Sequence, residues 1–220
     1  MKNKLVKLLV FVTVLAGAFY IFKLFYNPDK AMVSTSGNNG EIREGDLIFQ
    51  SSFSEQGKAI QQATKSVYTH CGIIYKRNGK YYVYEAVQPV KLTPLDQWIA
   101  RGKNHHYVIK RLSNADQVLI PEALEKMKKE GEKFLGKNYD STFEWSDTRI
   151  YCSELIWKIY KRGTGVEIGK LEKLKDFDLT GAEVKKKLKE RYGENIPLEE
   201  TVISPASVFN SELLITVKEQ

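Results

Sequence analysis

Cysteine and histidine are scarce in this chain: its 220 residues include only two cysteines and three histidines. Two cysteines are too few for a disulfide scaffold or a Cys-rich zinc site. No glycine-rich phosphate-binding loop is present. Hydrophobic residues make up 42% and charged residues 28%, which excludes collagen-like, low-complexity and wholly disordered proteins. A chain of this length buries a core without disulfides, and we expect one globular domain with an appendage.

Acidic residues are absent from the first 26 residues, which contain Lys2, Lys4, Lys7 and Lys23. These four lysines leave only +3 of the formal net charge of +7 for the rest of the chain. Such a small excess does not indicate nucleic-acid binding, and we expect no nucleic-acid partner. More than half of the net positive charge therefore belongs to a predicted targeting segment.

The N-terminal segment is the one long apolar run. Met1–Lys7 is basic, and the uncharged run Leu8–Phe22 follows. A cleaved signal peptide would use Ala16–Ala18 as its cleavage site. We favour the alternative, an uncleaved anchor over 1–26, because cleavage after Ala18 would leave an apolar N-terminus in solvent. No cysteine follows the run, which argues against a bacterial lipoprotein signal.

Lysines before the apolar run indicate a cytoplasmic N-terminus by the positive-inside bias. The predicted protein is therefore a single-pass protein of the cell membrane with its domain on the extracytoplasmic side. Signal cleavage would instead give a secreted or periplasmic domain. Residues 27–40 are rich in Ser, Gly and Asn and are typical of a linker. A folded domain is expected over 41–220.

The order of elements predicts an α+β domain with an antiparallel sheet packed on helices. Asn78-Gly79 lies between two β-rich runs and is a strong hairpin signal. Expected strands are 47–49, 69–75, 80–87, 107–112 and 213–217; expected helices are 55–65, 115–135, 151–161 and 180–192.

The hairpin brings together two candidate catalytic side chains. If it turns on Asn78-Gly79, then Gly72 lies opposite Glu85, and His70 and Glu85 become diagonal neighbours on one face. A carboxylate so placed holds the imidazole in one tautomer and stabilises its charged form. The alternative is that His70 caps the strand while Glu85 faces solvent, and a register slip of one residue would separate the two.

Cys152 is the candidate nucleophile. It falls in the first turn of the predicted 151–161 helix, where the helix dipole and free backbone N–H groups lower a thiol pKa and can bind an oxyanion. The alternatives are a small buried hydrophobic residue or a disulfide with Cys71. Strand alternation directs Cys71 away from His70, so we do not expect a nucleophile that works with His70 to pair easily with Cys71.

No metal site or cofactor is expected. His105 and His106 are adjacent, so in a strand they would face opposite sides and could not bind one metal together. We therefore expect them at the surface.

Five segments resemble those of the circularly permuted papain-like amidases of the NlpC superfamily, YiiX/YaeF-like. They are Gly45–Phe49, Thr69–Tyr75, Glu85, Gly136–Asp140 and Tyr151–Leu155. The chain order His, Glu, Cys is the one that the permuted group implies. By this resemblance Cys152 is the nucleophile, His70 the general base, Glu85 the residue that orients it, and Tyr139 lies near the oxyanion site.

Two departures from the family pattern concern the substrate. The chain has Cys152-Ser153-Glu154-Leu155 where NlpC-type enzymes have Cys-Ser-Gly-Leu, which puts the usual murein-peptide pocket in doubt. The segment 163–197 has no counterpart in the short NlpC domains. The resemblance implies a cysteine amidase or peptidase, with a cell-wall peptide as the first expected substrate. The alternatives are hydrolysis or acyl transfer on N-acyl, lipid-like amides, or a non-catalytic module that binds a peptide or acyl chain. The oligomeric state is not predictable from these residues.

Overall fold

A computed structural model describes residues 40–220 of the chain. The predicted anchor or signal segment and nearly all of the predicted linker lie outside these residues. Within residues 40–220, no helix is long and apolar enough to cross a membrane.

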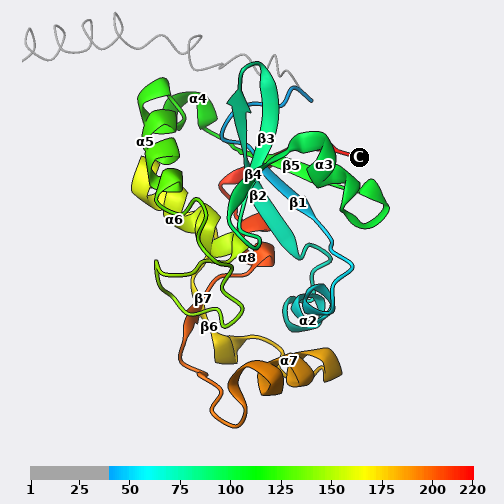
Figure 1. The fold of residues 1–220 in the computed structure, drawn as a ribbon. Coiled ribbons are helices and arrows are strands. Elements are labelled where there is room, and N and C mark those ends of the chain that lie inside the picture. Colours follow the sequence, from blue (N-terminus) through cyan, green and yellow to red (C-terminus); the bar gives the residue numbers. More distant parts are fainter. Residues whose placement is uncertain (1–39) are drawn as a thin grey trace, which may run out of the picture. The chain divides into compact units, whose positions relative to one another are not determined.

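The domain is built on a six-stranded antiparallel sheet with the strand order β4-β3-β2-β1-β5-β8 (Figure 1). The strands are β1 (Leu47–Gln50), β2 (His70–Arg77), β3 (Lys80–Glu85), β4 (Lys91–Pro94), β5 (Val108–Leu112) and β8 (Leu214–Glu219). Together with its helices, this sheet confirms the predicted α+β class.

The hairpin of β2 and β3 has the predicted register. Arg77 pairs with Lys80 and Ile73 with Tyr84. Asn78 and Gly79 form the turn with positive φ values of 50° and 76°, as a two-residue hairpin turn requires. Gly72 allows β3 to approach, because a Cβ there would lie 2.4 Å from Val83 Cγ1.

Helices cover both faces of the sheet. On one face, α5 (Pro121–Glu132) and α6 (Cys152–Thr164) pack on the apolar side chains of β1 and β2. On the other face, α3 (Leu95–Ala100) inserts Trp98 among Ile48 and Ile74. The alternating side chains of the strands thus enter two separate cores.

The single helix expected over 115–135 is two helices, α4 (Ala115–Val118) and α5. Pro121 explains the break, because it starts α5 at a position where its missing N–H costs nothing. The structure also contains elements that the sequence did not suggest: β4, α3, α8 (Pro205–Phe209) and the 3₁₀ turns η2 (Lys103–His105) and η3 (Leu174–Asp176).

A third, smaller core joins distant parts of the chain. Helix α2 (Glu55–Thr64) packs against α7 (Ala182–Tyr192), and they bury Ala59, Leu174, Val184 and Leu188 between them. The short strands β6 (Glu172–Lys173) and β7 (Thr201–Val202) pair beside this core. The segment 163–197 is therefore an integral part of the fold.

Candidate active site

The hairpin brings His70 and Glu85 into direct contact. His70 Nε2 lies 2.6 Å from Glu85 Oε2, as the predicted register requires. The Glu85 carboxylate is fully buried, and His70 stacks on the Trp98 ring with 6.0 Å between centroids. The alternative in which Glu85 faces solvent is therefore wrong.

Four donors surround the Glu85 carboxylate. Besides His70, they are the Thr93 hydroxyl at 2.5 Å, the Trp98 indole N–H at 2.9 Å and Arg101 Nη2 at 2.5 Å. Burial by itself would raise the pKa of Glu85, but hydrogen bonds and nearby positive charge outweigh it and lower this pKa to about 2. The group is therefore a permanent anion that holds the imidazole.

Cys152 is the first residue of α6, where backbone N–H groups have no partner within the helix. Hydrogen bonds with Cys71 and His70 stabilise its thiolate against the effect of burial and lower the pKa of Cys152 well below its ordinary value. Burial disfavours charge on His70, but hydrogen bonds with Cys152 and Glu85 raise its pKa to about 9. Since Nε2 faces Glu85, Nδ1 is the ring nitrogen left for Cys152. The arrangement favours a thiolate–imidazolium pair.

Cys71 is a neighbour of Cys152, and both thiols are free. The expectation concerned a disulfide between the two residues, and their thiols are not joined. Alternation separates Cys71 from His70 along the strand, but Cys152 lies beside the beginning of β2 and contacts both. Burial and the neighbouring Cys152 raise the pKa of Cys71 well above its ordinary value, so the two thiols differ sharply in acidity.

Tyr139 lies beside this pair, as the resemblance implies. Its backbone N–H donates to Gln88 Oε1 at 2.7 Å, and its hydroxyl accepts from Gln56 Nε2 at 2.6 Å. Burial and the charge of Cys152 raise the pKa of Tyr139 well above its ordinary value. The phenol therefore keeps its proton, which remains available to donate to an oxyanion.

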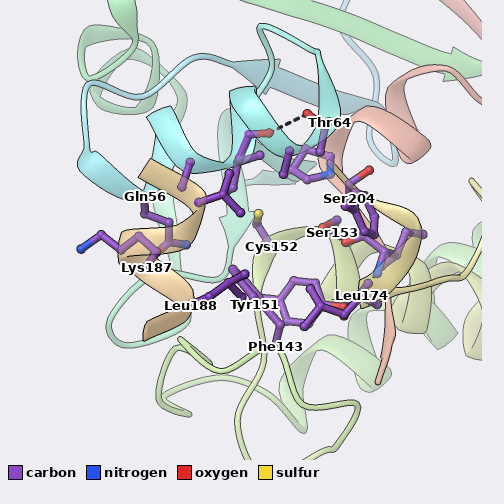
Figure 2. Close-up of a pocket in the computed structure, with 18 of the residues that line it drawn as sticks. Gln56, Thr64, Phe143, Tyr151, Cys152, Ser153, Leu174, Lys187, Leu188 and Ser204 are labelled. Atoms are coloured by element: carbon purple, nitrogen blue, oxygen red, sulfur yellow. Dashed lines mark hydrogen bonds between the residues drawn. The ribbon is translucent and has the colours of Figure 1, made fainter. Parts of the chain in front are cut away.

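Two cavities meet at these residues, and Gln56, Ile60 and Tyr139 line both. The first contains Cys152, has a volume of about 100 Å³ and is almost entirely apolar; Figure 2 shows Cys152 facing it, with Tyr151, Phe143 and Leu188 on its wall. Side chains of the 163–197 segment, including Leu174 and Leu188, form part of that wall. The second cavity contains His70 and Arg101, has a volume of about 490 Å³ and is lined largely by polar side chains.

Glu154 does not line either cavity. Its carboxylate is buried, accepts from the Tyr151 backbone N–H at 3.4 Å and pairs with Lys158 at 2.7 Å. Burial, partly offset by Lys158, raises the pKa of Glu154 to about 7. The departure from Cys-Ser-Gly-Leu thus affects the start of α6 rather than the wall of a substrate pocket.

Sequence reasoning missed Thr93, Trp98, Arg101 and Gln56. No motif marks them, because tertiary packing brings them to the site from separate elements. Thr93 is in β4, Trp98 is in α3, Arg101 follows α3, and Gln56 is in α2. His105 is exposed and His106 is half-buried; neither lines the two cavities.

The comparisons with known proteins identify the family. A family model described as the permuted papain-like amidase enzymes, YaeF/YiiX, C92 family, matches residues 41–218. The chain belongs to this family. An uncharacterized protein, YiiX of Escherichia coli K12, is 49% identical over 189 residues, which cover 86% of this chain and 92% of that protein. A crystal structure of yiiX from Escherichia coli O157:H7 has a TM-score of 0.77 and 51% identity, and covers 81% of this chain and 97% of that one.

The yiiX protein of that crystal structure is described as a metalloprotein. In the described part of this member of the permuted papain-like family, no group of three or more His, Cys, Asp or Glu side chains is placed to hold a metal ion. Each side chain of the His70–Glu85–Cys152 set is instead engaged with another protein group.

Proposed function

We propose that this protein is a cysteine amidase in which Cys152, His70 and Glu85 act as nucleophile, general acid–base and orienting carboxylate. The observation that carries the proposal is the continuous contact from Glu85 through His70 to Cys152 at the start of α6. A binding module has no reason to hold a buried carboxylate, an imidazole and an acidic thiol in one line.

In the proposed reaction, the Cys152 thiolate attacks the amide carbonyl carbon and forms a C–S bond. Backbone N–H groups at the start of α6 and the Tyr139 hydroxyl stabilise the oxyanion. The C–N bond breaks as the His70 imidazolium gives its proton to the leaving amine. Water then attacks the thioester carbonyl, His70 accepts its proton, and the carboxylic acid leaves as the thiolate is restored.

The acyl part of the substrate is proposed to be apolar. The cavity that contains Cys152 is lined by apolar side chains such as Phe143, Leu174 and Leu188, and its volume of about 100 Å³ compares with roughly 150 Å³ for a cavity that binds benzene. Burying a polar cell-wall peptide against this lining would leave its hydrogen-bonding groups unpaired. The lining therefore supports an N-acyl amide over the cell-wall peptide first expected.

Hydrolysis of fluorogenic aryl amides with straight acyl chains of two to eight carbons, by residues 40–220, tests this function. We expect kcat/KM to rise about fourfold for each methylene until the cavity is filled, because each buried methylene contributes about 0.8 kcal/mol. Cys152→Ala and His70→Ala should each lower kcat more than about a thousandfold, and the double variant should cost little more than either. His106→Ala, outside both cavities, is the matched control.

Undiminished hydrolysis by a folded Cys152→Ala protein would refute the nucleophile. A kcat/KM that does not depend on acyl-chain length would refute the apolar acyl group while leaving the amidase chemistry intact.

We also propose where the protein acts: residues 1–26 anchor it in the membrane, with the domain on the extracytoplasmic side.

A further inference from the structure

The position of His70 determines which cavity takes the leaving group. In the proposed function, on which this inference rests, His70 protonates the amine nitrogen, so the amine must lie on the His70 side of the scissile bond. The cavity lined by His70 is the more polar of the two. The acyl chain and the amine therefore occupy different cavities, one almost entirely apolar and one with many hydrogen-bonding side chains. Gln56, Ile60 and Tyr139 line both cavities and lie at the junction.

The polar cavity is suited to an anion. Among the described residues that line it, Gln50, Ser52, Ser54, Gln88 and Ser141 are uncharged hydrogen-bonding residues. Arg101 is charged, and His70 carries a proton at neutral pH because its pKa is raised to about 9. No Asp or Glu of the described chain lines this cavity; Glu85 is fully buried behind His70.

Arg101 is placed to bind a ligand as well as Glu85. It follows the last residue of α3, and its Nη2 donates to Glu85 Oε1 at 2.5 Å. Its side chain is nevertheless 44% exposed. A guanidinium has five N–H donors in a planar fork. Within residues 40–220 the acceptor for this side chain is Glu85, so donors remain for a group in the cavity.

We infer that the leaving amine carries a carboxylate bound by Arg101, as in an N-acyl amino acid. An α-amino acid places its carboxylate two bonds from the scissile nitrogen, so one molecule presents its nitrogen to His70 and its anion to the guanidinium. Arg–carboxylate pairs are strong and geometrically specific because the fork matches the two oxygens. Arg101 is therefore a specificity-determining residue as well as a positioning residue for Glu85.

Three substrates with the same acyl chain test the inference: N-octanoyl-glycine, N-octanoyl-glycinamide and N-octanoyl-phosphoethanolamine. Glycinamide has the shape of glycine without the charge, and phosphoethanolamine carries its anion as a phosphate. Released octanoate, measured by chromatography, gives kcat/KM for all three. We expect kcat/KM for N-octanoyl-glycine to exceed that for N-octanoyl-glycinamide by about tenfold or more, since a hydrogen bond to a charged group contributes that much. It should also exceed kcat/KM for N-octanoyl-phosphoethanolamine.

Arg101→Gln should reduce the ratio of kcat/KM for N-octanoyl-glycine to kcat/KM for N-octanoyl-glycinamide to about one. Arg101→Lys keeps the positive charge and should retain part of the wild-type ratio. Loss of the contact with Glu85 would slow both substrates by the same factor, so the ratio separates recognition from positioning. Lys103→Gln removes a similar charge two residues away from an exposed side chain outside the cavity, and it should keep the wild-type ratio.

The inference would be overturned by a glycine-to-glycinamide ratio of kcat/KM near one in the wild type, or by an unchanged ratio in Arg101→Gln. In either case, hydrolysis of N-octanoyl-glycinamide would still support the proposed amidase. Faster hydrolysis of N-octanoyl-phosphoethanolamine than of N-octanoyl-glycine would refute the claim that Arg101 binds a carboxylate. It would indicate a leaving amine that carries a phosphate. Hydrolysis of none of the three, together with none of the aryl amides, would refute the proposed function itself.

Discussion

Replacing Glu85 by glutamine tests the buried anion. The carboxylate accepts from His70, Thr93, Trp98 and Arg101. An amide has the same shape, and its oxygen can still accept from His70 and Trp98 while its NH₂ group donates to the Thr93 hydroxyl. Arg101 loses its acceptor but is 44% exposed and can turn to solvent. We therefore expect the variant to fold without the charge.

The expected loss of stability follows from linkage. The fold lowers the pKa of Glu85 from about 4.5 to about 2, which corresponds to about 3 kcal/mol of stability at neutral pH. For a domain of this size, the melting temperature should fall by about 6–12 °C. A lowered carboxyl pKa stabilises the fold above the unfolded pKa, and this contribution is lost as the pH falls towards the folded pKa. The difference between wild type and Glu85→Gln should thus shrink to about 1.5 kcal/mol at pH 3.

Thermal unfolding between pH 3 and pH 7 measures this difference. Glu167→Gln is the matched control, because Glu167 is exposed and forms a surface pair with Lys161, and its melting temperature should change by no more than about 1 °C. A Glu85→Gln protein as stable as the wild type at pH 7, or a difference that does not depend on pH, would refute the account of Glu85 as a stabilised buried anion.

Three further predictions concern reactivity and placement. A natively folded protein should react with iodoacetamide at Cys152 faster than at Cys71, because the Cys152 pKa is lowered and the Cys71 pKa is raised; peptide mapping showing equal or inverted rates would contradict the assignment. Amidase kcat/KM should decline as the pH rises through about 9, where His70 loses the proton that the leaving amine needs; a pH–rate profile without this alkaline limb would argue against His70 as the acid. Protein isolated from membranes should keep Met1 or Lys2 at its N-terminus and resist extraction by high salt, whereas a mature N-terminus at Phe19 in a soluble fraction would show that the segment is a cleaved signal peptide.

The contact between His70 and Glu85 was predictable because it is local. Asn78-Gly79 determines the turn, the turn determines the register, and alternation then places both side chains on one face. The position of Cys152 at the start of a helix could likewise be inferred from the apolar spacing that follows it. Both inferences use periodicities of single elements, which a sequence displays directly.

The remaining contacts to Glu85 could not be found in this way. Thr93 and Trp98 lie on a four-residue strand and a six-residue helix, which are too short for a clear periodic pattern. Arg101 follows that helix without any motif. The role of α7 was also hidden, although its helix was expected over 180–192, because its packing against α2 joins segments far apart in the chain. The apolar character of the Cys152 cavity depends on that tertiary contact.

The chain order of the site has a consequence for biosynthesis. His70 and Glu85 are only 15 residues apart on one hairpin, whereas Cys152 is made much later, and β8, which completes the sheet beside β5, comes last. A ribosome makes the N-terminal part first, so the growing chain contains the proposed acid–base residues long before the proposed nucleophile. In the proposed mechanism, the partially synthesised protein therefore cannot form an acyl-enzyme, because Cys152 joins the site only when α6 packs on the finished hairpin.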